Sequence, residues 1–304
     1  MNAGHLSALI KSEARELGFD SCGITRPAKF SSQIQYLRHW IDKGYHAGMH
    51  YMSKNTNIRE DIRQRFPRVQ SVVVVLLNYN PRKVQYTQSF RFAKYAYGND
   101  YHEVMTKKLN SLLQMIRVHI PANGVIFTDT GPVFEKQYAV EAGLGWIGKN
   151  TLLIAPLFGS YVLIGELFLD VVLEYDHPFN GSRCGDCTRC IDACRSNALS
   201  AAYVLDSNRC ISYLNKDTDK ESAIDFQGFV FGCDICQDVC PFNCECPPHN
   251  EPDFYPYPGF IEMSDNEWLS LNSAAFNEYF SHTPAGRMTF RRMQRNIMRC
   301  ANHF

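Results

Sequence analysis

Eight of the twelve cysteines in this chain lie within one short segment, and no other feature limits the possible folds as strongly. They form a run of four, a single cysteine and a run of three, namely Cys184, Cys187, Cys190, Cys194, then Cys210, then Cys233, Cys236 and Cys240. Residues 1–20 show no secretory signal, so we expect a reducing compartment rather than disulfides. Zinc sites favour pairs of cysteines, not a triplet with a trailing fourth.

The spacing is that of bacterial two-cluster ferredoxins, where three close cysteines hold one cluster and the next cysteine in the run holds the other. It therefore predicts two [4Fe-4S] clusters with crossed ligand sets. The first set is Cys184, Cys187, Cys190 and Cys240, and the second is Cys194, Cys210, Cys233 and Cys236. Pro241 keeps the ferredoxin pattern, whereas Arg195 stands where ferredoxins usually carry proline.

For the other four cysteines, the sequence gives weaker evidence of a function. Cys22 lies in an apolar stretch and is expected to be a small core residue. Cys244 stays an alternative to Cys240, although the Cys-Pro pair favours Cys240. Neither Cys246 nor Cys300 is assigned a role.

The composition is that of a globular protein with a hydrophobic core. With 304 residues, 45% of them hydrophobic, the chain suits two domains or one domain with a cluster insert. Its formal net charge is zero, so no overall field attracts a polyanion. No apolar run approaches the length of a membrane span. We expect a cytoplasmic protein.

Hydrophobic periodicity divides the chain into helices and strands. Helices are predicted at residues 5–18, 31–43, 100–120, 137–143, 265–271 and 284–299. Strands are predicted at residues 20–25, 71–78, 125–129, 152–154 and 161–173, the last two as an antiparallel pair around Gly159. Residues 71–78 are apolar on both faces, which predicts a central strand.

The expected fold is α+β. An α/β core at residues 1–176 is followed by a ferredoxin-like two-cluster module at 177–247 and a helical extension at 248–304 that packs on the core. The core has neither a G-x-G-x-x-G turn nor a Walker loop, so no nucleotide motif identifies the electron acceptor.

Several other segments closely resemble the epoxyqueuosine reductase family. They are residues 97–102 (YGNDYH), 128–133 (TDTGPV), 141–153 (EAGLGWIGKNTLL), 209–214 (RCISYL) and 232–237 (GCDICQ). The resemblance runs from about residue 5 to residue 300. Longer members carry a C-terminal array of helical repeats, and we expect this chain to be the short form.

The resemblance implies an enzyme with cobalamin and two [4Fe-4S] clusters that reduces epoxyqueuosine to queuosine at the wobble position of tRNA. The core would then be a cobalamin-binding domain related to reductive dehalogenases. Asp100, Tyr101 and His102 begin like the D-x-H-x-x-G signature of other cobalamin proteins, but Met105 replaces its glycine. We therefore expect no protein histidine on the cobalt.

The same resemblance assigns roles to individual residues. Asp129 matches the proton donor, and burial against the corrin would raise the pKa of its carboxyl. Without the resemblance, an aspartate at a strand end would be an ordinary turn or cap residue. His102 is the second candidate, for proton delivery or for orienting Asp129, against a purely structural role. The expected cofactor contacts are Arg59, Asp129, Lys149, Asn150 and Ser212.

A basic stripe on the last predicted helix is the candidate tRNA contact. It contains Arg287, Arg291 and Arg295. Positions 291 and 295 are four apart and share a helix face. Phosphate contacts of this kind would supply local charge in a chain that has no net charge. The alternative is a helix whose arginines are solvated or paired within the protein.

Two other functions stay open. One is a cobalamin-dependent, dehalogenase-like reductase of a small molecule, and the other is a non-catalytic electron-transfer module. We expect the protein to be a monomer that takes electrons from a flavodoxin- or ferredoxin-type carrier.

Overall fold

The structure is a computed structural model that describes residues 2–87 and 89–302. Residue 1 of the first predicted domain and residues 303–304 of the third lie outside the described residues. The α-helices are α1 (Ala3–Glu16), α2 (Ser31–Asp42), α3 (Thr56–Glu60), α4 (Tyr101–His119), α5 (Glu135–Glu141), α6 (Arg189–Asp192), α7 (Ile211–Lys216), α8 (Ile235–Asp238), α9 (Asp265–Leu269), α10 (Ser273–Phe280) and α11 (Phe290–Ala301).

Strands and 3-10 helices make up the other regular elements of the described residues. The strands are β1 (Ser21–Thr25), β2 (Ser71–Asn78), β3 (Arg91–Phe92), β4 (Gly124–Phe127), β5 (Trp146–Ile147), β6 (Leu153–Ile154), β7 (Val162–Leu169), β8 (Leu199–Ala201), β9 (Val204–Leu205) and β10 (Phe229–Phe231). The 3-10 helices are η1 (His50–Ser53), η2 (Ile62–Gln64), η3 (Lys94–Ala96), η4 (Pro241–Asn243), η5 (Pro252–Phe254) and η6 (Pro284–Arg287).

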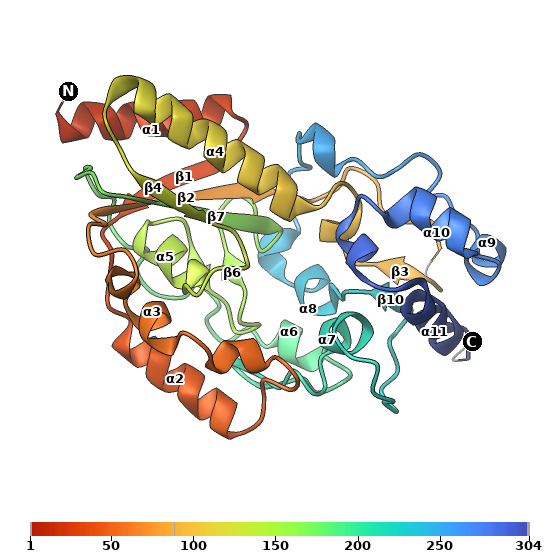
Figure 1. Ribbon diagram of the computed structural model, residues 1–304. Helices are drawn as coiled ribbons and strands as arrows, with labels where there is room; N and C mark the ends of the chain where they lie inside the picture. Colours follow the sequence, from red (N-terminus) through yellow and green to blue (C-terminus); the bar gives the residue numbers. More distant parts are fainter. Residues whose placement is uncertain (1, 88, 303–304) are drawn as a thin grey trace.

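An antiparallel sheet in the order β1-β2-β7-β4 is the frame of the core. Every residue of β2 is buried, and the strand lies inside the sheet, as its apolar sequence predicts. Figure 1 shows α1 and α4 on one face of this sheet and α5 on the other. The α+β class is therefore confirmed.

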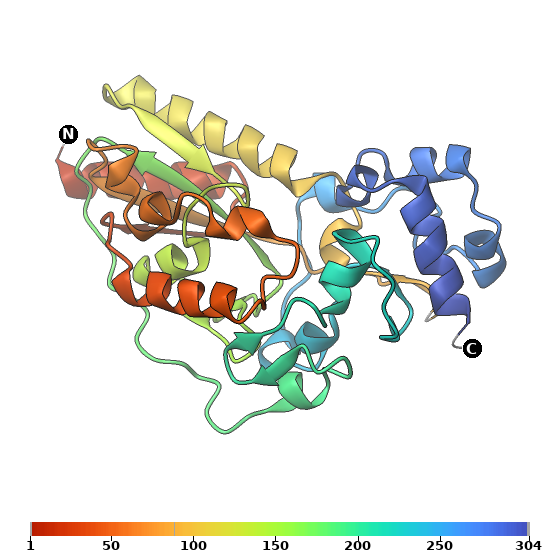
Figure 2. The same ribbon diagram turned by 60° about the horizontal axis from the view of Figure 1, so that its bottom comes forward.

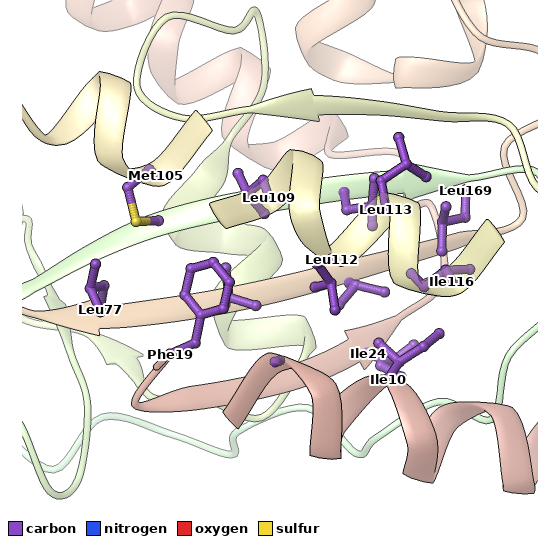
Figure 3. Packing of buried hydrophobic residues seen from close by; sticks show 14 of the residues in the cluster. Ile10, Phe19, Ile24, Leu77, Met105, Leu109, Leu112, Leu113, Ile116 and Leu169 are labelled. Carbon is purple, nitrogen blue, oxygen red and sulfur yellow. The ribbon is translucent and has the colours of Figure 1, made fainter. Parts of the chain in front are cut away.

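The α1–α4 face is packed by apolar residues at helical spacing (Figure 3). Leu109, Leu112 and Ile116 of α4 lie against Ile10 of α1 and Leu77 of β2, and all five side chains are buried. Each such side chain contributes about 1.5–3 kcal/mol relative to exposure. Helix α4 is thereby fixed in position, and its second residue, His102, is one of the predicted site residues.

The opposite face packs on α5. Tyr138 and Ala139 of α5 contact a cluster that contains Val74 of β2 and Phe168 of β7. Glu166 lies between these apolar residues, because it pairs with Val74 in the register of the sheet. Its side chain is fully buried.

The predicted C-terminal extension shares a core with the other two predicted segments. Strand β10 pairs in parallel with β3, and α11 packs beside β10. Phe92, Phe231 and Phe280 lie in one apolar cluster, although they come from the three predicted segments. Figures 1 and 2 place α9, α10 and α11 at the end of the molecule away from the N-terminus. The domain boundaries at 176 and 247 stay a prediction.

Two predictions about secondary structure are wrong. Strand β6 pairs with β5 rather than with residues 161–173, and β7 inserts between β2 and β4. Gly145 permits the close approach of β5, since a Cβ there would stand 2.2 Å from the carbonyl oxygen of Ile154. A helix was also missed, because α10 lies between the two predicted C-terminal helices and α11 begins only at Phe290.

Candidate active site and cluster module

The structure gathers the cysteines around two separate cavities. A small cavity is lined by Cys184, Cys187, Cys190 and Cys240. A larger one is lined by Cys194, Cys210, Cys233 and Cys236. These are the two sets that the spacing predicts as cluster ligands, brought together although residues 184 and 240 are far apart in the sequence.

The thiols of each set are also electrostatic neighbours. Burial raises the pKa of Cys240, and the nearby Cys184 raises it further. Burial likewise raises the pKa of Cys236, with Cys233 and Cys210 adding to the effect. Neutral thiols are thus favoured in the free protein, whereas metal coordination deprotonates a thiol outright. Each cavity thus brings together four thiols, the number of cysteine ligands that a [4Fe-4S] cluster takes.

The remaining cysteines lie outside both sets. Cys244 is exposed and is not part of the lining of the small cavity among the described residues, in contrast to Cys240. Cys246 is buried, and its thiol donates to the carbonyl of Phe158 at 3.1 Å. Burial raises the pKa of Cys22 and Cys300 to about 12, as in unreactive core thiols.

Asp129 lies on a strained turn directly after β4. Its φ is +60°, a left-handed conformation that is uncommon outside glycine. The turn is held on both sides. The hydroxyl of Thr128 donates to the carbonyl of Ile164 at 3.0 Å, and the backbone N–H of Asp129 donates to the carboxyl of Glu135. Such strain is typical of functional positions.

A hydrogen-bonded chain leads from the C-terminal extension to Asp129. Arg287 Nε donates to Asp100 Oδ2 at 2.7 Å, and Asp100 Oδ1 lies 2.7 Å from His102 Nδ1. His102 Nε2 lies 3.2 Å from Asp129 Oδ2, which also accepts the Tyr101 hydroxyl at 2.7 Å. Asp100 is the N-cap of α4, so helix formation itself places His102 beside it. The contact with Asp129 is compatible with the expected role of orienting it, and that role stays a prediction.

The expected direction of the pKa shift of Asp129 is wrong for this structure. The hydrogen bond from His102 lowers the pKa of Asp129, and this effect outweighs burial. Burial lowers the pKa of His102, but its bonds to Asp100 and Asp129 more than offset this and raise it. Because the side chain of Asp129 is 60% exposed, burial cannot keep it neutral. The two shifts therefore favour a proton on the imidazole of His102 over one on the carboxyl of Asp129.

A cavity of about 360 Å³ separates the sheet from the cysteines of the second set. Val162, Leu163 and Ile164 of β7 form an apolar wall. Asn150 and Ser212, both predicted cofactor contacts, line the cavity. This volume lies in the range of pockets for organic ligands.

Two of the predicted cofactor contacts lie elsewhere. Lys149 lines the small cavity, and its ammonium group donates to the carbonyl of Gly185 at 2.6 Å. Arg59 lines neither cavity, and donates to the carbonyl of Val133 at 3.0 Å. Burial lowers the pKa of Arg59, and the nearby Glu135 opposes this. Both side chains donate to backbone carbonyls of neighbouring loops, and their predicted contact with a cofactor stays a prediction.

Two carboxyl groups near Asp129 are not among the predicted site residues. Glu135 is the first residue of α5, and Glu166 lies in the middle of β7. Burial raises the pKa of both, and the charge of Asp129 raises it further. A single acidic residue within the apolar strand VLIGELFL was the signal that could have found Glu166.

The predicted basic stripe divides into exposed and paired arginines. Arg291 is exposed, and the side chain of Arg287 is 54% exposed despite its bond to Asp100. Arg295 is only 20% exposed and donates to the carbonyl of Thr218 at 2.9 Å and to that of Leu214 at 3.3 Å. For Arg295, the structure therefore favours pairing within the protein, because helix α11 turns this side chain onto the segment after α7.

Comparisons with known proteins agree with this geometry. Residues 59–130 match the family model "Epoxyqueuosine reductase QueG, DUF1730", and residues 183–243 match the "4Fe-4S double cluster binding domain". An epoxyqueuosine reductase from Leadbetterella byssophila is 40% identical over 95% of this chain and 96% of its own length. One from Cyclobacterium marinum is 38% identical, with 95% and 94% covered.

Solved structures give the same result. The crystal structure of an epoxyqueuosine reductase with a tRNA-Tyr epoxyqueuosine-modified stem loop has a TM-score of 0.90 and 28% identity, covering 99% of this chain and 82% of that chain. A catabolic reductive dehalogenase has a TM-score of 0.50 and 16% identity, covering 81% of this chain and 33% of that one, which is a likeness of fold alone. In residues 2–87 and 89–302, no helix has both the length and the apolar character needed to cross a membrane.

Proposed function

This chain belongs to the epoxyqueuosine reductase family, and we propose that it reduces the epoxide of epoxyqueuosine in tRNA to the alkene of queuosine. It is an oxidoreductase with two [4Fe-4S] clusters. One observation carries the proposal: a cavity lies between the cysteines of the second set and Tyr101, whose hydroxyl is hydrogen-bonded to Asp129. The ligands of one cluster and the side chain that holds Asp129 thus line one ligand-sized space.

The residues around the large cavity fit cobalamin, whose flat corrin ring is edged by amide groups. The apolar residues of β7 suit the ring. The side-chain nitrogen of Asn150 is buried and has no hydrogen-bond partner among the described residues, so it is available to a ligand. We propose that Asn150 and Ser212 hold the cofactor. When bound, cobalamin supplies a low-valent cobalt that can attack an epoxide carbon.

Reduction of an epoxide to an alkene and water consumes two electrons and two protons. The two clusters, when bound, would supply electrons one at a time. The leaving oxygen must be protonated. Asp129 would donate this proton, and its 3.2 Å contact with His102 supports His102 as the group that returns a proton to it. Tyr101 keeps its own proton, because burial and the charge of Asp129 raise its pKa. It positions Asp129 without acting as an acid.

Recognition of the tRNA and of the electron carrier belongs to the same proposal. Arg287 of η6 and Arg291 of α11 are exposed arginines that could contact phosphates. The loop with Cys184 and Cys187 has exposed neighbours, which would let a flavodoxin- or ferredoxin-type carrier approach the first cluster. We propose a cytoplasmic monomer.

The test is anaerobic reconstitution with iron, sulfide and cobalamin, followed by metal analysis and by incubation with a stem loop that carries epoxyqueuosine. Two clusters, one cobalt and conversion of the epoxide to queuosine are the expected results. Full iron content without cobalt would indicate an electron-transfer module. Cobalt binding without conversion of the epoxide would indicate a reductase of another substrate.

A further inference from the structure

Two fully buried asparagines join the C-terminal extension to the second set of cysteines, and the proposed function uses neither of them. They are Asn215 of α7 and Asn296 of α11, and solvent reaches neither residue. A buried amide is destabilising unless its donors and its acceptor are hydrogen-bonded. When they are, such a polar network fixes the backbone groups around it in one arrangement.

The side chain of Asn215 binds the turn that precedes Cys233. Its Oδ1 accepts the backbone N–H of Gly232 at 3.0 Å, and its Nδ2 donates to the carbonyl of Gly232 at 2.8 Å. Nδ2 also donates to the carbonyl of Phe229 at 3.0 Å. Gly232 has a φ of +67°, and a Cβ there would stand 2.5 Å from the Cβ of Ala93, so the turn requires glycine at this position.

The same asparagine belongs to the helix that begins directly after Cys210. Cys210 is the N-cap of α7, and Ser212 in the first turn lines the large cavity. Burial raises the pKa of Cys210, and the backbone N–H groups of Tyr213 and Ser212 oppose this. The orientation of α7 therefore sets how strongly these N–H groups favour a negatively charged sulfur. Asn215 thus connects two cysteines of the second set, one through its own helix and the other through Gly232.

Helix α11 holds this arrangement from the side of the C-terminal extension (Figure 1). Nδ2 of Asn296 donates to the carbonyl of Asn215 at 2.8 Å and to that of Val230 in β10 at 2.9 Å. Oδ1 of Asn296 accepts from Nε and Nη2 of Arg295 at 3.1 Å and 2.9 Å. Arg295 in turn donates to the carbonyl of Leu214 at 3.3 Å. The last turn of α7 is therefore bound to α11 at two successive backbone carbonyls.

We propose that Asn215 is a positioning residue for the second cluster, and that Asn296 acts with it through the backbone of α7. The cysteines of this set line the large cavity, so their positions determine where the cluster lies relative to a bound cofactor. Hydrogen bonds near the sulfurs also set the reduction potential of a cluster. The inference concerns the cluster alone, so it holds whichever substrate the protein reduces.

Reconstituted full-length protein in two cysteine backgrounds tests the proposal without any turnover. Cys240→Ser removes a ligand of the first set, so the remaining iron reports on the second cluster. Adding Asn215→Leu to this background should lower the reduction potential of the remaining cluster in titrations followed by electron paramagnetic resonance, or release its iron. The potential should fall because the N–H groups near Cys210 stabilise the more negative, reduced form. Added to Cys210→Ser, where the iron reports on the first cluster, Asn215→Leu should change neither quantity.

Asn78→Leu is the matched control for the loss of a buried amide. Asn78 is also buried, but its side chain bonds to Asn80, Cys246 and Pro247 rather than to the segments that carry Cys210 and Cys233. This substitution should lower the melting temperature and leave the potentials and the iron content of both clusters unchanged. A general loss of stability is thereby separated from an effect on the second cluster.

Asn215→Asp is the second variant, for the case that Asn215→Leu does not fold. Aspartate has nearly the same size and keeps an acceptor for the N–H of Gly232, but an ionised carboxyl has no donor for the carbonyls of Gly232 and Phe229. It should shift the second cluster in the same direction. A wild-type second cluster in this variant, or an equal effect on the first cluster, would overturn the proposal. If the wild type holds both clusters but does not reduce the epoxide, only the proposed function fails.

Discussion

Replacing His102 by glutamine tests whether the imidazole holds the proton that Asp129 delivers. His102 lies 2.7 Å from Asp100 and 3.2 Å from Asp129, and these two carboxylates raise its pKa. Glutamine can still hydrogen-bond to either neighbour, but its amide carries no acidic proton. The change therefore removes the proton and leaves the shape of the site largely intact.

The expected loss of rate follows from the catalytic groups that remain in the site after the substitution. General acid catalysis contributes about 10²–10⁴-fold, or about 2.7–5.4 kcal/mol in the barrier. Because Asp129 is still present and still accepts the Tyr101 hydroxyl at 2.7 Å, the loss should be about 10²-fold at neutral pH. A complete loss is expected only when Asp129 itself is replaced.

The sign of the pH effect distinguishes this mechanism from a structural role. Since the pKa of His102 is raised, the imidazolium is fully present below the ordinary histidine value and is lost as pH rises through the raised value. The wild-type rate should therefore fall only at alkaline pH. Without His102, protonation depends on the carboxyl of Asp129, so the fall should begin at lower pH and the loss should shrink in acid.

The assay is a single turnover of the reduced, cobalamin-loaded enzyme with an epoxyqueuosine stem loop, followed by mass spectrometry of the nucleosides. His119→Gln, at the exposed end of the same helix, is the matched control. An unchanged rate for His102→Gln, or a loss of equal size at every pH, would refute the reasoning.

Three further predictions concern the clusters, the C-terminal helix and the tRNA contact. Cys240→Ser should lose about half of the iron after reconstitution, whereas Cys244→Ser should keep all of it, as iron and sulfide analysis will show. Asn296→Leu should lower the free energy of unfolding by about 2–4 kcal/mol in denaturant titrations, since the Asn296 amide donates to two buried backbone carbonyls. Arg291→Ala should weaken stem-loop binding and reduce the slope of its salt dependence by about 1 in anisotropy measurements. Arg295→Ala should instead lower stability, and the reverse result for the two arginines would show that the wrong one had been assigned to tRNA.

Features that depend on residues close together in the sequence could be predicted from it. The spacing of the cysteines limits which sulfurs can reach one cluster, so it predicts the two sets that the structure gathers. Apolar periodicity likewise predicted α4 and the buried strand β2. The pairing of β6 was missed, because it depends on the close approach that Gly145 allows, and periodicity does not report such contacts.

The sequence by itself determined the family, the two-cluster module and the identity of Asp129 as a candidate donor. Only the tertiary structure decided where the protons lie. Arg287, which acts on His102 through Asp100, is 187 residues from Asp100, and Glu166 comes from the centre of a strand that periodicity marks only as buried. The pKa of a group is set by the charges, hydrogen bonds and burial around it in space. Those surroundings come from distant parts of the chain, and folding alone brings them together.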